Sequence, residues 1–341
     1  SRYMADEIAN QYLESGVEFF AGGGYRFFIP KDGLEYKGNL LKSKRGDNKN
    51  LVKEFKDKGY QTFLSKADTD SFRNYNPEPK DKVFATFTYS HTPYELDRKN
   101  SDVTPSLAEM TDKAIDVLDS YENGFFMMVE GARIDHACHA NDPAGTIYDT
   151  IAFDDALGKA YDFYKEHSEE TLIVVLADHE TGGFGLGFGK NYFLKMEEID
   201  KVKCTTADVL QGKYDGNRIG YFKFLSENYG LNDLTSEERS KIEKAMDLVD
   251  SGQEGEANRY GGYDPVAITV THIISERANM NWTTYAHSGT AVPMSALGVG
   301  ASKLGGFKDN TEIAKIMAEL MNGTLTHVNN SEELKQYSVA Q

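Results

Sequence analysis

The chain has 341 residues and a mass of 38.1 kDa, enough for one large α/β domain with insertions or for two domains. Its 54 acidic residues outnumber its 37 basic residues, and the resulting net charge of −17 argues against nucleic acid as a partner, because it repels phosphate backbones. A hydrophobic content of 40% and an aromatic content of 12% exclude a disordered chain. The longest apolar runs, 125–129 and 172–177, are much shorter than the ~20 residues of a membrane-spanning helix.

Helical and strand-like segments alternate along the first half of the chain. Apolar residues at helical spacing predict a helix over 3–15, and the apolar run 17–20 before Gly22-Gly23-Gly24 predicts a strand that ends in a turn. The same patterns predict further helices at about 50–58, 106–121 and 145–167, and further strands over 60–64, 83–88, 124–129 and 171–177. This alternation predicts a three-layer α/β/α fold with a mostly parallel central sheet and helices on both faces.

The pattern changes between about residues 190 and 263. This region is charged, has Gly-rich turns and lacks strong strand runs, so we expect it to be an insertion that contains no metal ligand, since it has no His. The α/β pattern then resumes with a helix over 265–277, an apolar stretch over 292–299 and a final amphipathic helix around 313–321.

Residues able to bind metal ions follow the predicted strand 124–129. Glu130 comes directly after that strand, and Asp135 and His139 lie four positions apart. One helical turn would direct Asp135 and His139 toward a common point, as a zinc ion requires. The alternative is a solvated polar loop with a helix cap.

A second group of ligands follows the predicted strand 171–177. Asp178 and His179 stand at its carboxyl end, where loops of α/β sheets form ligand sites, although such a pair alone usually indicates a capping Asp beside a surface His. His287 lies in a turn of small residues, and alone it would be read as a surface histidine. Together the two groups and His287 form a nitrogen and oxygen set suited to Zn²⁺ and Mg²⁺, and paired ions of this kind suit phosphoryl transfer.

Three of these motifs, in order along the chain, resemble alkaline phosphatases of the bacterial type. The segment 124–139 resembles the family segment that carries the magnesium glutamate and two ligands of the first zinc. The segment 177–183 resembles the motif of the second zinc, and 287–289 resembles the segment that holds the last histidine of the first zinc. Gly22-Gly23-Gly24 and the segment 91–98 fit the same family.

The resemblance implies two Zn ions and one Mg ion, and it identifies the residues that bind these ions and the substrate. It assigns Asp135, His139 and His287 to the first zinc, Asp178 and His179 to the second, Glu130 to magnesium, and Arg2 and His136 to the substrate phosphate. It also implies an alkaline-phosphatase-like fold with a crown-type insertion, hydrolysis of small-molecule phosphate monoesters through a phosphoserine intermediate, and a periplasmic or secreted location. A homodimer is compatible with it.

The sequence departs from the family pattern at the nucleophile. The three Asp-Ser pairs, at 70–71, 119–120 and 250–251, are followed by Phe, Tyr and Gly and do not match the family's Asp-Ser-Ala-type motif, and they lie in the wrong part of the chain. The chain also opens on Ser1-Arg2 with no initiator Met and no signal segment. We therefore expect residues 1–341 to be the C-terminal part of one alkaline phosphatase domain, inactive by itself, with the nucleophilic Ser upstream of Ser1.

Two other readings remain open at this point. One is a related phosphodiesterase, sulfatase or phosphomutase on the same metal scaffold, although the full ligand order with Glu130 favours the monoesterase. The other is a non-catalytic metal-binding fragment, which the missing nucleophile supports. The two cysteines, Cys138 and Cys204, show no CxxC spacing and do not identify the redox compartment.

Overall fold

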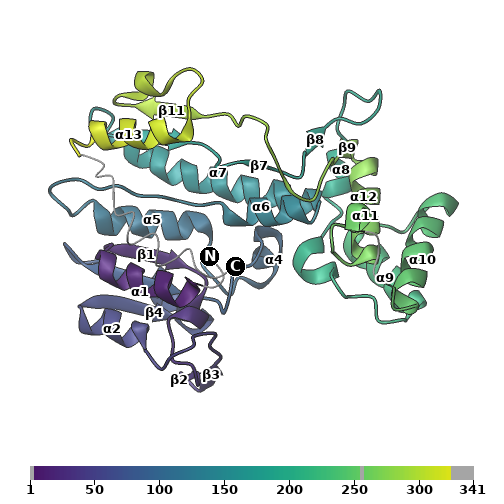
Figure 1. Cartoon of the computed structure of the whole chain (residues 1–341), viewed down its shortest axis with the longest axis horizontal. Helices are drawn as coiled ribbons and strands as arrows, with labels where there is room; N and C mark the ends of the chain where they lie inside the picture. The colour runs from purple at the N-terminus through teal and green to yellow at the C-terminus, as the bar shows by residue number, and fades with distance from the viewer. Residues whose placement is uncertain (1–3, 254–256, 324–341) are drawn as a thin grey trace, which may run out of the picture. The chain divides into compact units, whose positions relative to one another are not determined.

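The structure is a computed structural model that describes residues 4–253 and 257–323 (Figure 1). The chain divides into two compact units. One contains Ser1–Phe163 and His179–Thr290, and the other contains Tyr164–Asp178 and Ala291–Gln341. The predicted phosphate ligand Arg2 lies outside the described residues.

A parallel three-stranded sheet organises the N-terminal part of the first unit. Its strands are β1 (Phe19–Gly22), β5 (Lys82–Thr86) and β4 (Tyr60–Leu64), with β5 in the centre. Both pairings are parallel, with Phe84 opposite Phe20 in β1 and Thr62 in β4. The predicted parallel arrangement is therefore confirmed for this sheet.

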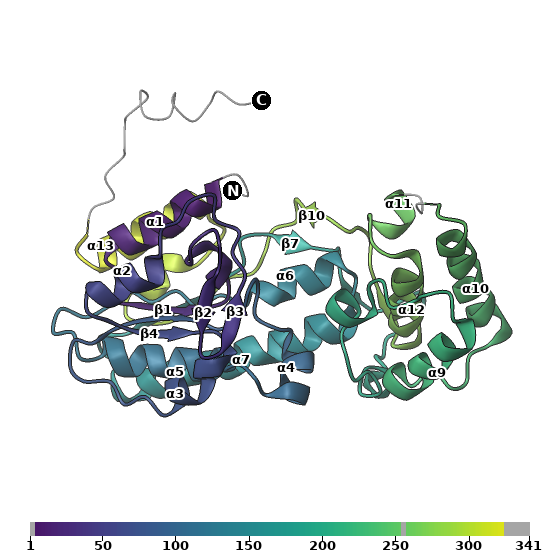
Figure 2. The same ribbon diagram turned by 90° about the horizontal axis from the view of Figure 1, so that it is seen from below.

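Helices cover both faces of this sheet. The side chains of β5 alternate between the two faces, so each face presents apolar groups that a helix can bury. Phe84 packs into the apolar cluster of one face, and Val83 and Ala85 pack into that of the other. Figure 2 shows the helices on either side of the strands. The helices are α1 (Ala5–Ser15) and α2 (Leu51–Asp57) on one side, and α3 (Thr69–Arg73) and α5 (Leu107–Leu118) on the other.

Four phenylalanine rings form the centre of the first of these clusters. Phe84 is fully buried and stacks on Phe55, with ring centroids 4.0 Å apart and planes 13° apart. The rings of Phe28 and Phe20 lie 4.9 Å and 5.4 Å from that of Phe84. The Phe84 ring of β5 thus packs against side chains from three other segments, which are β1, α2 and the loop after β1.

Short elements complete this part of the unit. They are the 3₁₀ turns η2 (Tyr25–Phe27) and η3 (Lys66–Asp68), the hairpin of β2 (Leu34–Tyr36) and β3 (Asn39–Leu41), and the helix α4 (Glu95–Ser101). Helix α5 begins with a capping box, in which Ser106 accepts from the Glu109 amide and Glu109 accepts from the Ser106 amide.

Two helices follow and lead toward the candidate ligands. Helix α6 (Ala132–His139) is short, and α7 (Pro143–Glu166) has 24 residues, close to the predicted helix at 145–167. Helix α7 carries acidic residues along its length, including Asp149, Asp154 and Asp155. Among the described helices, none combines the length and the apolar composition needed to cross a bilayer.

The predicted insertion is largely helical. Its elements are α8 (Met196–Ile199), the π-helical turn η4 (Thr206–Leu210), α9 (Arg218–Tyr229), α10 (Ser236–Asp250) and α11 (Ala257–Tyr260), and α12 (Pro265–Arg277) follows them as predicted. Helix α12 is apolar on all sides and forms the centre of their core. Arg277 at its end binds both carboxylate oxygens of Glu238 in α10, at 2.7 Å each. Figures 1 and 2 show these helices grouped at one end of the unit, with α6 between them and the parallel sheet.

The second unit is built on a strand pair. Strand β6 (Leu172–Val175) pairs antiparallel with β11 (Ser295–Gly298), and η5 (Ala301–Leu304) and α13 (Asn310–Leu320) follow. The predicted strand over 171–177 and the predicted final helix are confirmed. The partner of β6 among the described residues is antiparallel, so the mostly parallel sheet that we expected extends only over β1, β5 and β4.

The predicted strand over 124–129 is wrong. This segment has no regular secondary structure and forms no ladder with any described strand. Phe126 and Met128 on one side of it are 60% and 75% exposed. Apolar composition alone does not make a strand, because the backbone also needs a hydrogen-bonding partner.

The aromatic cluster predicts the stability of the first unit. Replacing Phe84 by Ala should lower the free energy of unfolding by about 3–5 kcal/mol, because the cavity would lie among rings held in separate elements. The control Phe193→Ala removes a ring that is 82% exposed and should cost about 0.5 kcal/mol or less. Urea unfolding followed by circular dichroism measures both, and equal losses would contradict the packing described here.

Candidate metal centre

Helix α6 brings Asp135 and His139 together. The two residues lie one turn apart, and Nε2 of His139 is 3.4 Å from Oδ1 of Asp135. The convergence predicted from their spacing is confirmed. The helix ends directly after His139, where Asn141 adopts the left-handed backbone conformation with φ of 50°.

A small strand pair brings His287 to the same place. Strand β10 (His287–Ser288) pairs antiparallel with β7 (Glu180–Thr181), with His287 opposite Thr181. His287 Nε2 lies 3.5 Å from Asp135 Oδ1 and 3.0 Å from His139 Nε2. His179 precedes β7, and its ring stacks on that of His287 with centroids 3.5 Å apart. The three predicted histidines therefore meet around Asp135.

Hydrogen bonds fix the orientation of two of these side chains. His139 Nδ1 lies 2.6 Å from the carbonyl oxygen of Tyr285, and a carbonyl only accepts, so Nδ1 carries the proton. The lone pair of His139 is then on Nε2, which faces Asp135 and His287. Thr181 Oγ1 donates to Asp135 Oδ1 at 2.6 Å. Contacts of this kind hold metal ligands in place in metalloproteins.

The distances fit a zinc ion. Tetrahedral zinc with bonds of ~2.0–2.1 Å holds its ligand atoms about 3.3 Å apart. The ligand atoms of Asp135, His139 and His287 are separated by 3.0 to 3.5 Å. Asp135, His287 and His179 also offer one atom each within 4.8 Å of one another. Two imidazole nitrogens and a carboxylate oxygen suit zinc chemically.

Cysteine plays no part in this site. Cys138 lies on α6 between Asp135 and His139, but its buried Sγ faces Thr146 Oγ1 at 3.5 Å. Burial raises the pKa of this thiol to about 11, so it stays protonated and is a poor ligand. Cys204 instead faces the hydroxyl of Tyr229.

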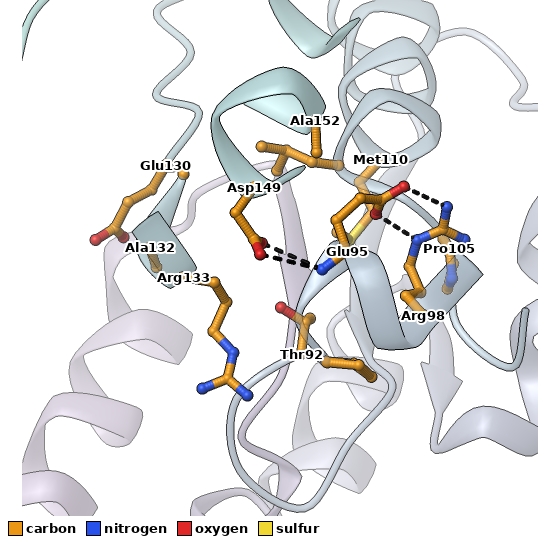
Figure 3. A pocket seen from close by; sticks show the side chains of 13 residues that line it. Thr92, Glu95, Arg98, Pro105, Met110, Glu130, Ala132, Arg133, Asp149 and Ala152 are labelled. Carbon is orange, nitrogen blue, oxygen red and sulfur yellow. Dashed lines mark hydrogen bonds and ion pairs between the residues drawn. The ribbon is translucent and has the colours of Figure 1, made fainter. Parts of the chain in front are cut away.

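Glu130 and Asp178 are not part of the described ligand group. Glu130 is exposed and lies two residues before α6, and in Figure 3 its carboxylate points away from Asp149. Asp178 belongs to the second unit although it adjoins His179 in sequence. Their assignments to magnesium and to the second zinc stay predictions. His136, the predicted phosphate contact, packs its ring 4.5 Å from that of His91, and burial lowers the pKa of both imidazoles.

Two residues that support the ligands were missed in the sequence. Thr181 follows His179 by two positions, and Tyr285 precedes His287 by two. Their contacts reach Asp135 and His139, which lie far away in the sequence, so local spacing gave no signal for them. Ser288 was also missed, and its hydroxyl donates to the Glu180 carboxylate, which ties β10 to β7.

A small pocket of about 60 Å³ lies beside Glu130, between α4, α6 and α7 (Figure 3). The backbone amide of Glu95 donates to both carboxylate oxygens of Asp149, at 3.2 and 3.3 Å. The carboxylate of Glu95 receives two hydrogen bonds from Arg98, at 2.7 and 2.8 Å. Burial raises the pKa of Asp149 to about 7 from its ordinary value of 3.8.

A family model for alkaline phosphatases matches residues 2–322. The chain belongs to the alkaline phosphatase family. It is 31% identical over 327 residues to alkaline phosphatase 4 of Bacillus subtilis, an alignment that covers 94% of this chain and 62% of that protein. The chain thus spans less than two thirds of the length of this relative.

Solved structures of alkaline phosphatases share the fold. The enzyme of Thermus thermophilus superposes with a TM-score of 0.75 at 28% identity, over 94% of this chain and 66% of that one. The cold-active enzyme of a psychrophilic Shewanella superposes with a TM-score of 0.71 at 27% identity, over 94% of this chain and 69% of that one. The family resemblance drawn from the three motifs is confirmed, and the fold is the mixed α/β fold of alkaline phosphatases.

The ligand triangle predicts how zinc content responds to mutation. Asp135→Ala or His287→Ala should lower the zinc bound per chain by about one equivalent, because two protein ligands remain where a catalytic zinc usually has three. His167→Ala is the matched control, since this histidine pairs with Glu170 in the second unit. Elemental analysis after dialysis measures the metal. Wild-type zinc content in either site variant would refute the assignment.

Asp149 predicts a dependence of stability on pH. Its pKa is higher in the folded chain than in the unfolded one, so folding favours its protonated form. The ionised carboxylate therefore destabilises the fold fully above pH 7, and this effect declines as the pH falls toward 3.8. Asp149→Asn should be more stable than wild type at pH 8 and should keep less than half of that advantage at pH 5. Urea unfolding at both pH values tests this, and an advantage independent of pH would contradict it.

Proposed function

We propose that this chain carries the metal-binding part of an enzyme that hydrolyses small-molecule phosphate monoesters. The observation that carries the proposal is the triangle of Asp135, His139 and His287 ligand atoms at zinc spacing. Family membership supports the reaction class. The order of the ligands along the chain supports a monoesterase over the related diesterases, sulfatases and mutases.

The proposed ligand sets extend this triangle. Asp135, His139 and His287 hold the first zinc, and Asp178 and His179 hold the second. Glu130 binds magnesium. Bound zinc and magnesium ions supply positive charge beside the phosphoryl oxygens.

The chain's own residues prepare the first of these sets. Tyr285 keeps the proton of His139 on Nδ1, so that Nε2 presents a lone pair without prior proton loss. Thr181 holds the Asp135 carboxylate toward the two imidazoles. Because these groups are oriented before any ion binds, little reorganisation is needed on loading.

Two further residues are proposed to bind the substrate phosphate. Arg2 contacts two phosphoryl oxygens, a role suited to the planar fork of a guanidinium. His136 lies next to Asp135 on α6 and contacts the phosphate through water. Both roles rest on the family motifs.

We place the nucleophilic serine upstream of Ser1 and the covalent intermediate on that residue. Two of the three serines in the Asp-Ser pairs have structural contacts, since Ser120 Oγ donates to the Val117 carbonyl and Ser251 Oγ to the Leu248 carbonyl. On this proposal residues 1–341 are the C-terminal part of one three-layer α/β/α domain, and the region at about 190–263 is its crown-type insertion. A periplasmic or secreted location completes the proposal, on the strength of the family motifs.

The proposal predicts the behaviour of the chain with and without an upstream segment. Loaded with zinc and magnesium, the 341-residue chain should bind metal and hydrolyse 4-nitrophenyl phosphate poorly, because it lacks the nucleophile. The same chain, extended by the segment that precedes the matched region in alkaline phosphatase 4 of Bacillus subtilis, should hydrolyse it much faster. A chelator should abolish that activity.

Two comparison substrates separate the related activities. Bis(4-nitrophenyl) phosphate reports a diesterase and 4-nitrophenyl sulfate a sulfatase, and both should be poor substrates. Equal turnover by the short and extended chains would place the nucleophile within residues 1–341. Metal binding without turnover by either form would favour a non-catalytic metal-binding protein.

A further inference from the structure

Basic side chains gather beside the metal ligands in a chain whose net charge is −17. Arg133 and His136 lie one turn apart on α6, with Nη1 of Arg133 3.5 Å from Nδ1 of His136. The ring of His91 meets that of His136 edge to face at 4.5 Å. Burial lowers the pKa of His91, and the nearby His136, Arg133 and Arg26 lower it further. The guanidinium charge of Arg133 beside two imidazoles, in an otherwise acidic protein, favours the binding of an anion.

Arg133 is held rigidly within this group. Its guanidinium carbon lies 3.7 Å from the centroid of the Tyr94 ring, and Nη2 donates to Asp208 of η4 at 2.5 Å. Its side chain is 11% exposed, and its buried Nε has no hydrogen-bond partner among the described residues. In Figure 3 the guanidinium points away from Asp149 and from the Glu95–Arg98 pair. Arg133 is therefore held in a fixed orientation, with Nη2 engaged by Asp208 and Nη1 facing Nδ1 of His136.

Helix α6 places this cluster next to the ligand triangle. Arg133 and His136 are three residues apart, and Asp135 and His139 are four apart on the same helix. The two pairs form neighbouring stripes on its surface. A small ester whose phosphoryl group binds beside Asp135 can therefore extend its leaving group along α6 toward Arg133.

We propose that Arg133 and His91 form a second anion-binding subsite beside His136, which receives a carboxylate or phosphate group carried by the leaving group of the substrate. The proposal deepens the proposed function and rests on it, because it names the substrate class as phosphate monoesters with a second anionic group. The guanidinium binds the oxygens of that group, and the imidazole of His91 lines the remaining side. A single charge-assisted contact of this type favours the anionic ligand by about tenfold or more over a neutral one.

A pair of unreactive ligands of equal shape tests the subsite. (3-Carboxyphenyl)phosphonate and (3-carbamoylphenyl)phosphonate differ in one charge at the position of the leaving group. Isothermal titration of the zinc-loaded full chain at pH 7.5 should show about tenfold tighter binding of the carboxylate. Arg133→Met should remove this preference and leave the affinity for the carbamoyl ligand unchanged, and Arg133→Lys should restore part of it.

Arg239→Met is a matched control, because Arg239 also lies over an aromatic ring, that of Phe222 at 4.0 Å, and pairs with a carboxylate, that of Glu243. It should keep the full preference. If Arg133→Met no longer binds zinc or the carbamoyl ligand, His91→Gln is used as the test variant instead. The preference for the carboxylate ligand should then be smaller in His91→Gln than in the wild-type chain.

Four results would overturn the inference. Equal binding of the two phosphonates by the wild-type chain excludes the subsite but leaves the proposed function standing. If neither ligand binds, the proposed function loses its support as well. A preference that survives both Arg133→Met and His91→Gln places the anion elsewhere. Two inorganic phosphate ions per zinc-loaded chain, falling to one in Arg133→Met, would assign the subsite to free phosphate rather than to the leaving group.

Discussion

Two imidazole nitrogens that face each other across 3.0 Å are the constraint on which this site depends. His139 donates its Nδ1 proton to the Tyr285 carbonyl, so its Nε2 presents a lone pair toward Nε2 of His287. Two lone pairs at this distance repel each other unless a proton or a cation lies between them. The Asp135 carboxylate, within 3.5 Å of both nitrogens, adds negative charge and favours a cation. The two nitrogens and the carboxylate oxygen therefore suit a bound cation, which is the basis of the metal centre that we propose.

Elements from distant parts of the first unit hold these side chains in place. Helix α6 supplies Asp135 and His139 from one turn, and the β7–β10 pair delivers His287 from a distant part of the sequence. The turn between α6 and α7 is tied to the insertion, because the buried Asp142 accepts hydrogen bonds from the amides of Gly145 and Thr206. Arg133 makes a second tie through Asp208. The insertion thus contributes to the rigidity of α6 without contributing a ligand to the described metal group.

Local patterns in the sequence correctly predicted the helices and strands that depend mainly on residues close to one another in the chain. The i, i+4 spacing of Asp135 and His139, the alternation of helices and strands around β1, β4 and β5, and the helix over Pro265–Arg277 all follow from short-range periodicity. The convergence of the three histidines was predicted from strand ends, but only His179 follows a strand, since His139 lies on α6 and His287 begins β10.

The errors and omissions have a common physical cause, which is dependence on distant partners. The segment 124–129 has the composition of a strand, but a strand forms only where another backbone can pair with it. Strand β6 was predicted, yet its antiparallel partner β11 lies more than a hundred residues away and left no signal in the sequence of β6. The meeting of Arg133 with Tyr94 and Asp208 likewise depends on three separate elements.

X-ray absorption at the zinc edge of the chain loaded with one equivalent of zinc tests the central claim most directly. The account predicts a first shell of nitrogen and oxygen atoms at about 2.0–2.1 Å, with the outer-shell scattering of two imidazole rings. A shell of oxygen atoms alone, or a sulfur ligand at about 2.3 Å, would contradict it, because the ion would then not lie between His139 and His287.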